Sequence, residues 1–288
     1  NIINKSSAKI TISHQFRMYE PTLIGMISKE NNIKNILISH GSHVLSNKSI
    51  DQEPLYIQAK DILFSEFSSI NIPQSPMAYE FLKKYQPEAR IEPYKPIIWG
   101  YKSISNKSDS YFDQKKIKLL HASTSKQLCL RPYIYETAFE YIEGIKILCN
   151  KVNQFSNLEL IIKVRETKDY SIDTLKTLID TGQNCKIVHS GEFIDYLHQC
   201  DYLISFSSTT IEEALNYLKP VILYGYLDKY NFLPEEKNII YRSSTKNIGN
   251  LLKKISDEHP FLINNQNFNK YIWANDVKDI RSFIEKYI

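Results

Sequence analysis

The chain is poor in glycine and lacks the glycine-based motifs that bind phosphates. It has 8 glycines in 288 residues, about 3%, whereas proteins on average contain about 7%. No G-x-G, P-loop or G-x-S-x-G pattern occurs. These absences remove the sequence support for a dinucleotide fingerprint, for a P-loop and for a serine hydrolase nucleophile elbow.

Cysteine pairs and metal-ligand patterns are absent as well. The 4 cysteines lie far apart, with no C-x-x-C pair, at Cys129, Cys149, Cys185 and Cys200. This spacing favours reduced, buried thiols in a cytosolic protein. No D-x-D, H-E-x-x-H or clustered Cys/His pattern occurs, so we expect neither a bound metal nor a cofactor.

Long apolar runs and dense blocks of positive charge are also missing. No stretch approaches the roughly 20 apolar residues that span a bilayer, and the first residues lack the apolar centre of a signal peptide. The formal net charge is +4, from lysines scattered along the chain. This excess suits anionic ligands or a phospholipid surface, and it is too small to argue for nucleic acid. We expect a cytoplasmic protein, free or at the inner face of the membrane, with no nucleic-acid partner.

From Lys116 onward, strand and helix patterns alternate regularly. Short apolar runs predict strands at 116–123, 158–165, 185–191, 201–208 and 220–225. Amphipathic stretches between them predict helices at 132–152, 171–180, 193–200 and 209–218. This alternation is typical of a parallel sheet covered on both faces. The second half is therefore expected to be a Rossmann-like α/β domain.

The first hundred residues are less regular. Their pattern predicts strands at 9–14, 35–41, 61–66 and 89–94, helices at 20–32 and 75–86, and a polar loop before residue 61. These are too few elements for a complete Rossmann domain. Either the domain is reduced, or the chain starts partway into it.

The length of the chain suggests two domains. We expect an N-terminal domain at 1–100, a polar linker at 101–116 and a second domain at 117–265. The last segment, 266–288, ends in an amphipathic helix expected to pack back across the domains through Val277, Ile280, Phe283 and Ile284.

The segment CDYLISFSSTTIEEALNYLKPVILYG, residues 200–225, carries the strongest functional pattern. Ser207, Ser208, Thr209 and Thr210 follow a strand and begin a helix. In an open parallel sheet, ligands bind at this end of the strands, where helix N-termini offer free N–H groups. Hydroxyl side chains there can hold phosphate oxygens without a glycine loop.

A carboxylate lies one turn into the same helix. Glu213 points away from the apolar stripe formed by Ile211, Ala214, Leu215 and Leu218, so it could accept hydrogen bonds from a ribose. The alternative is helix capping, because Thr209-x-x-Glu212 and Thr210-x-x-Glu213 both fit a capping box.

The segment SSTTIEEALNYLKPVILYG resembles the SS-x-x-x-x-EAL-x-x-x-KPVI segment of GT-B glycosyltransferases. It is most similar to that of bacterial surface-polysaccharide and capsule transferases and the related CDP-glycerol glycerophosphotransferases. The resemblance implies that Ser207, Ser208 and Thr209 meet the donor phosphate and that Glu213 binds the ribose. It covers most of residues 117–230 and implies a GT-B-like α/β fold, with two Rossmann-like domains facing a cleft. UDP-GlcNAc 2-epimerases share this architecture.

The N-terminal half supplies candidate catalytic residues at two strand ends. His40 and Gly41 match a His-Gly pair that recurs in these families, which implies that His40 is a general base or a phosphate contact; His43 lies in the same loop. A loop histidine that caps a turn is the alternative.

His14, Arg17 and Glu20 occupy the other strand-to-helix junction. Glu20 is a second candidate base and the other two are candidate acceptor contacts. An intrahelical ion pair between Arg17 and Glu20 is the alternative.

The first two strands of the second domain end in further polar residues. His121, Ser123, Thr124 and Lys126 follow the first strand, and Lys163 and Arg165 end the next. We expect Thr124, Lys163 and Arg165 to contact the nucleotide. In the resembling enzymes a His-Pro pair follows the lysine that Lys163 matches, and this pair is missing here. The alternative is that Lys163 and Arg165 are solvated cations on the protein surface. Ser190 and Gly191 either touch the base or form a plain turn.

These patterns favour a metal-independent glycosyltransferase. Its donor would be a sugar activated by CMP, CDP or UDP, and its acceptor a surface polysaccharide or a lipid-linked glycan, with peripheral membrane contact. The alternatives are a nucleotide-sugar 2-epimerase and a non-catalytic nucleotide- or glycan-binding module.

Overall fold

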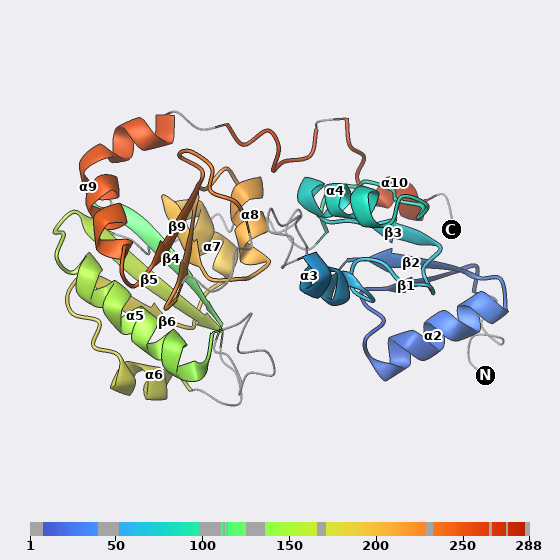
Figure 1. Cartoon of the computed structure of the whole chain (residues 1–288), viewed down its shortest axis with the longest axis horizontal. Helices are drawn as coiled ribbons and strands as arrows, with labels where there is room; N and C mark the ends of the chain where they lie inside the picture. The colour runs from blue at the N-terminus through green and yellow to red at the C-terminus, as the bar shows by residue number, and fades with distance from the viewer. Residues whose placement is uncertain are drawn as a thin grey trace. The chain divides into compact units, whose positions relative to one another are not determined.

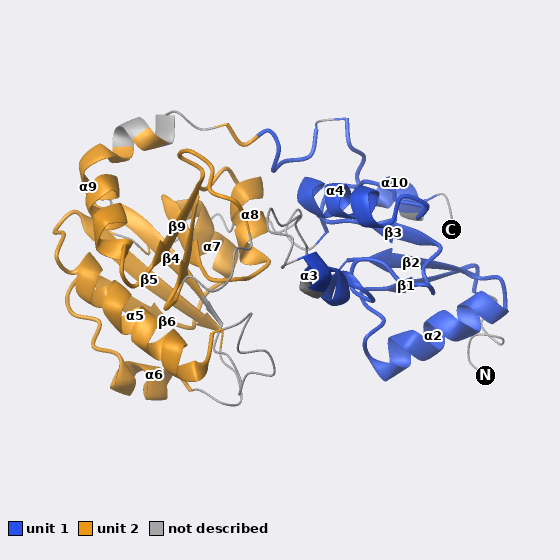
Figure 2. Cartoon of the chain, in the orientation of Figure 1, with its two compact units in different colours: residues 1–102, 269–288 blue, residues 103–268 orange. Residues whose placement is uncertain are grey.

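A computed structural model describes residues 8–39, 52–97, 111, 113, 115–124, 136–165, 171–227, 233–264, 267–274 and 276–285. The chain forms two compact units (Figure 2). The first contains residues 1–102 and 269–288, and the second contains residues 103–268. The chain therefore returns to the first unit at its C-terminal end.

The second unit is built on one parallel sheet. Its strands are β4 (Ile117–Thr124), β5 (Leu158–Arg165), β6 (Cys185–Val188), β7 (Tyr202–Ser205), β8 (Val221–Gly225) and β9 (Ile240–Ser244). All neighbours pair in parallel, in the order β6-β5-β4-β7-β8-β9. The α/β fold with parallel sheets predicted from the sequence is confirmed.

The helices of this unit are α5 (Ala138–Val152), α6 (Ile172–Leu178), α7 (Phe193–Gln199), α8 (Thr210–Asn216) and α9 (Ile248–Asn264). α5 and α9 pack together on one face of the sheet, whereas α7 and α8 cover the other (Figure 1). α5 begins six residues later than predicted. The helix starts at Ala138 because Thr137 is its N-cap residue and forms a capping box with Glu140.

The strand order reverses between β4 and β7. The chain runs outward from β4 through β5 to β6, then returns to place β7 on the free side of β4. Helices on opposite sides of the sheet diverge at such a reversal and leave a crevice beyond the carboxyl ends of the two strands. The side chain of His121 faces α5, because Leu119, two residues earlier on β4, packs in the core with the α5 residues Tyr141 and Ile145.

The first unit contains a smaller parallel sheet. Its strands, in the order β1-β2-β3, are β1 (Ile10–Ser13), β2 (Lys34–Ile38) and β3 (Ile70–Ile72). Its helices are α2 (Tyr19–Glu30), α3 (Gln52–Ala59), α4 (Pro76–Tyr85) and α10 (Arg281–Ile284). Ile280 and Phe283 are buried in its core with Ile36, Ile70, Ile72 and Tyr94.

Several predictions for the first unit were wrong. Residues 61–66 form turns and not a strand: Asp61 has φ +64°, and the Ile62 and Leu63 amides both bond to the Ala59 carbonyl at the end of α3. The expected polar loop before residue 61 contains α3. Residues 89–94 make a single bridge, between Asn71 and Ile91.

The C-terminal helix expected over 275–288 is observed only at Arg281–Ile284. Of the side chains expected on its buried face, Ile280 and Phe283 are buried and Val277 is half-buried, while the Ile284 side chain lies outside the described part of the chain. Among the described helices, none has the length and hydrophobicity that crossing a membrane requires.

Candidate functional site

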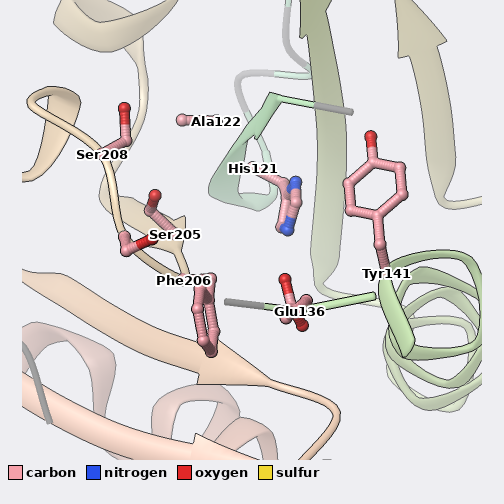
Figure 3. A pocket seen from close by; sticks show the side chains of 8 residues that line it. His121, Ala122, Glu136, Tyr141, Ser205, Phe206 and Ser208 are labelled. Carbon is pink, nitrogen blue, oxygen red and sulfur yellow. The ribbon is translucent and has the colours of Figure 1, made fainter. Parts of the chain in front are cut away.

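A pocket lies at the strand-order reversal of the second unit (Figure 3). It has a volume of about 270 Å³, including the open space at its mouth. Its described lining comes from the ends of β4 and β7 and from the start of α5: His121, Ala122, Glu136, Tyr141, Ser205, Phe206, Ser207 and Ser208. This is where a doubly wound parallel sheet binds ligands.

His121 forms one wall of the pocket from within the sheet. It pairs with Ile162 on β5 and Ile204 on β7, and only 6% of its surface is exposed. Among the described residues, its Nδ1 atom has no hydrogen-bond partner. Burial lowers the pKa of the imidazole to about 4, because a buried charge loses its hydration. The ring is therefore neutral at physiological pH.

Serines at and just after the end of β7, the strand next to β4, form another part of the wall: Ser205, Ser207 and Ser208 (Figure 3 labels the first and last). Ser207 Oγ is out of contact with solvent and, within the described part of the chain, has no hydrogen-bond partner. Ser208 Oγ accepts a hydrogen bond from the Thr210 amide at 3.3 Å. A buried polar atom without a partner destabilises a protein by about 1–3 kcal/mol. Two such atoms in one pocket indicate a site at which a ligand completes the hydrogen bonding.

Glu136 places a carboxylate in the same pocket. It is 7% exposed, and its Oε1 atom accepts a hydrogen bond from the Tyr226 amide at 3.1 Å. Burial raises the pKa of the nearby Tyr224 hydroxyl, and the negative charge of Glu136 raises it further. The pocket wall therefore contains a carboxyl group held in place by a backbone N–H group.

The capping alternative for the hydroxyl cluster is not realised. Thr209 occupies the N-cap position of α8, but its side chain makes no cap hydrogen bond. Thr210 Oγ1 is buried and, among the described residues, also lacks a partner. Neither of the two possible capping boxes is therefore formed.

The buried face of α8 contains a different fourth residue from the one predicted. Ile211, Ala214 and Leu215 are buried as expected, but Leu218 lies past the helix end with φ +58° and is 54% exposed. Glu212 takes the fourth buried position, at 1% exposure. Glu213 is half-buried, and its charge adds to burial in raising the pKa of Tyr217. Thr209, Thr210 and Glu213 are not part of the pocket lining.

Lys163 and Arg165 lie at the end of β5, outside the pocket lining. Lys163 Nζ donates to the His189 carbonyl and lies 5.8 Å from the centroid of the Tyr196 ring. Burial lowers the pKa of Lys163, and the charge of Glu192 opposes this shift. Arg165 is exposed and in register with Thr124, whose side chain lies outside the described part of the chain, as does all of Lys126.

The Ser190–Gly191 turn packs beside Lys163. The Tyr196 hydroxyl donates to the Ser190 carbonyl at 3.0 Å, and Gly191 has φ +78°. The ring of Tyr196 stacks on Tyr111, with 4.0 Å between centroids. The residues at the ends of β5 and β6 thus form a second cluster beside the pocket lining.

The candidates in the first unit are exposed where they are described. His14 and Glu20 are exposed at the start and end of the β1–α2 junction. The Arg17 guanidinium donates to the carbonyls of Ile57 (3.0 Å), Lys60 (3.2 Å) and Gln58 at the C-terminal end of α3. Arg17 thereby joins α3 to the β1–α2 junction. His40, Gly41 and His43 lie outside the described residues.

Sequence reasoning did not select Glu136, Tyr141 or Phe206. The available signal was the capping box Thr137-x-x-Glu140, which places the start of α5 directly after Glu136 and Thr137. Among the described residues, no cluster of three or more His, Cys, Asp or Glu side chains could hold a metal ion.

No protein-family model and no curated protein matches this sequence. Solved structures with a similar fold include the UDP-GlcNAc 2-epimerase of Methanocaldococcus jannaschii in complex with UDP-GlcNAc and UDP. The two sequences are 14% identical and the TM-score is 0.60. The match covers 100% of this chain and 78% of the epimerase chain. The glycotransferase of kitacinnamycin has 12% identity and a TM-score of 0.60, with coverage of 99% and 77%. The MnaA protein of S. aureus with UDP has 12% identity and a TM-score of 0.58, with coverage of 100% and 77%.

At these identities the likeness concerns the fold. The chain has a two-domain, GT-B-like α/β architecture with Rossmann-type parallel sheets.

Proposed function

We propose that this protein is a glycosyltransferase that takes a sugar from a nucleotide-activated donor. The observation that carries the proposal is the pocket at the β4–β7 reversal, where His121 Nδ1 and Ser207 Oγ are buried without partners among the described residues. Such atoms call for a polar ligand, and the position is the one at which this sheet topology binds nucleotides.

The fold comparison supports a nucleotide-sugar ligand. One similar structure holds UDP-GlcNAc and UDP, another holds UDP, and a third is a glycotransferase. The donor proposed for this chain is accordingly a UDP, CDP or CMP sugar. The proposed acceptor is a surface polysaccharide or a lipid-linked glycan, met at the inner face of the membrane.

In the proposed reaction an acceptor hydroxyl attacks the anomeric carbon of the donor sugar. The bond from that carbon to the phosphate oxygen breaks, and the nucleotide leaves with the bonding electron pair. Hydroxyls at Ser207–Thr210 and the cations Lys163 and Arg165 would stabilise the negative charge on the leaving phosphate. Glu213 would accept hydrogen bonds from the ribose, and Glu20 or His40 would take the acceptor proton.

A panel of CMP, CDP, UDP and GDP tests the nucleotide part of the proposal. We expect one pyrimidine nucleotide to raise the melting temperature of the second unit, because a ligand that binds only the folded state stabilises it by mass action. A protein whose melting temperature none of the four nucleotides changes would contradict the proposal.

A nucleotide-sugar 2-epimerase is the second candidate, and the similarity to the M. jannaschii epimerase favours it. Incubation with UDP-GlcNAc in D₂O, without an acceptor, separates the two functions. An epimerase removes and returns the proton at carbon 2, so it would incorporate deuterium there and yield the epimer. A transferase would leave carbon 2 unlabelled and would release UDP rapidly only when an acceptor is added.

A further inference from the structure

We infer that the protein forms a two-fold dimer through its first unit, with β1 pairing to β1 of a second copy and the α2 helices of the two copies packing together. Six of the twelve large apolar side chains that are exposed in the described chain lie between residues 12 and 26. We call these six the β1–α2 face: Ile12, Met18, Tyr19, Leu23, Ile24 and Met26. The inference goes beyond the proposed function and does not depend on it.

α2 turns small residues toward the sheet and large apolar residues away from it. Its buried residues are Gly25 and Ser28, and a Cβ atom at Gly25 would lie 2.7 Å from the Phe16 ring. Leu23 and Met26 are exposed on the outer side. A surface helix normally has the opposite arrangement, with its apolar stripe on the core and its polar residues outside. The pattern of α2 is therefore that of a helix whose outer side is covered as well.

β1 is an edge strand without the features that usually protect an edge. In the order β1-β2-β3 it has a neighbour on one side only, among the described strands. None of its four residues, Ile10–Ser13, is charged or a proline, whereas exposed edges are commonly guarded by lysine, proline or a bulge. The N–H and C=O groups along an edge match those of an identical strand that runs antiparallel, and a two-fold axis produces this pairing. A second copy of the chain therefore fits the β1 edge.

Ile12 extends the β1–α2 face to the other side of the sheet. Thr11 Oγ1 lies 2.9 Å from Ser28 Oγ of α2 and shares a hydrogen bond with it, so Thr11 is on the α2 side. Ile12 points to the opposite side, because its register partner Ile36 packs in the core with Phe283 of α10. Ile12 is nevertheless 49% exposed. An added strand would cover Ile12 and would bring a second helix beside α2.

The spacing of strands and helices allows both contacts at once. α2 contacts both β1 and β2, so its axis lies over the two strands. Paired strands lie about 4.8 Å apart, so pairing of the two β1 strands would place the two α2 axes about 10 Å apart. Packed helices lie about 8–10 Å apart. One two-fold axis therefore pairs the strands and packs the helices.

The β1–α2 face is large enough for a specific interface. Its residues are 37–77% exposed, which gives an area of about 600 Å² if each fully exposed residue has about 200 Å². Two such faces would bury about 1,200 Å², the lower end of the range for specific protein–protein interfaces. We therefore expect a dimer that dissociates on dilution.

Sedimentation equilibrium over about 1–100 μM protein tests the dimer with two variants and one control. Leu23→Glu puts a charge on the outer side of α2, and Ile12→Lys puts one beside the strand edge. Each change places two like charges in one contact, so we expect either to weaken dimerisation at least about 10-fold. Leu178→Glu on α6 of the second unit is the matched control, because Leu178 is 42% exposed and Leu23 is 41% exposed. This control should leave the dimer unchanged.

Hydrogen exchange in the wild type gives a second measurement, which needs no variant to fold. The amides of Ile10–Ser13 should exchange more slowly at concentrations that favour the dimer. Exchange rates that do not change with concentration, a wild-type protein that stays monomeric, or a dimer that either folded variant leaves unchanged would overturn the inference. A monomer that binds phosphatidylglycerol vesicles, and loses this binding in Leu23→Glu, would also overturn it, because the face would then contact a lipid surface. None of these measurements involves a nucleotide, so the proposed function stands or fails separately.

Discussion

The buried imidazole of His121 makes the stability of the protein depend on pH in a way that one substitution removes. Its pKa is 6.5 when exposed and about 4 in the folded protein. As pH falls, the unfolded chain therefore binds this proton before the folded chain does. Stability is complete above about pH 6.5 and is lost progressively toward pH 4.

The magnitude follows from the two pKa values. Each pKa unit corresponds to about 1.36 kcal/mol, so the full loss is about 3 kcal/mol below both values, and about 2 kcal/mol is lost at about pH 5. Because His121 is only 6% exposed, solvent screening reduces this figure little. His198 and His259 also have pKa values lowered by burial, but they remain in the variant, so their contributions cancel.

His121→Phe should remove this dependence. Urea unfolding of wild-type and variant protein at about pH 7.5 and about pH 5 should show a stability loss about 2 kcal/mol larger in the wild type. In a ¹H NMR titration, the histidine signal missing from the variant should not shift between neutral pH and about pH 5. Equal pH dependence of the two proteins, or titration of that signal near pH 6.5, would refute the reasoning.

Three further substitutions test other parts of the structure. Glu213→Gln should weaken nucleotide binding by about 1–3 kcal/mol in calorimetry, and an unchanged affinity would remove Glu213 from the ribose site. Gly225→Ala would place a Cβ atom 2.7 Å from Phe206 Cδ2. This clash should lower the free energy of unfolding by about 1–3 kcal/mol, measured by thermal unfolding. Gly249→Ala is the control, because the atom nearest to its added Cβ is 3.4 Å away and the change should be tolerated. Leu218→Gly should stabilise the protein by about 1 kcal/mol, because φ +58° strains a branched side chain and not glycine; a lower melting temperature would contradict this.

The sequence by itself determined the second unit from residue 116 to residue 225, but not β9 and α9 beyond it. Each strand and helix predicted between residues 116 and 225 is present, because a strand buried on both faces is a short apolar run and each covering helix has an apolar stripe. Local pattern and tertiary environment agree there. The switch from strand to helix at Ser207–Thr210 is likewise a local property, so its place at the edge of the sheet could be predicted.

The first unit shows where local pattern fails. In the apolar run at 61–66, Leu63 and Phe64 are buried but lie in turns after α3, and the three-residue β3 lies further along the chain. A short apolar run shows that a segment is buried, but it does not distinguish a strand from a packed turn. Which run completes the sheet depends on how α3 packs, and that packing joins residues distant in sequence, such as Arg17 and Lys60.

Only the tertiary structure decided the composition of the site. His121, Glu136 and Ser207 come from three separate elements, and the return of β7 to the free side of β4 brings them together. The same packing buries Glu212 in α8 and leaves Leu218 exposed. Secondary structure follows from the order of neighbouring residues, whereas burial and the partners of a side chain depend on the surfaces that pack against it.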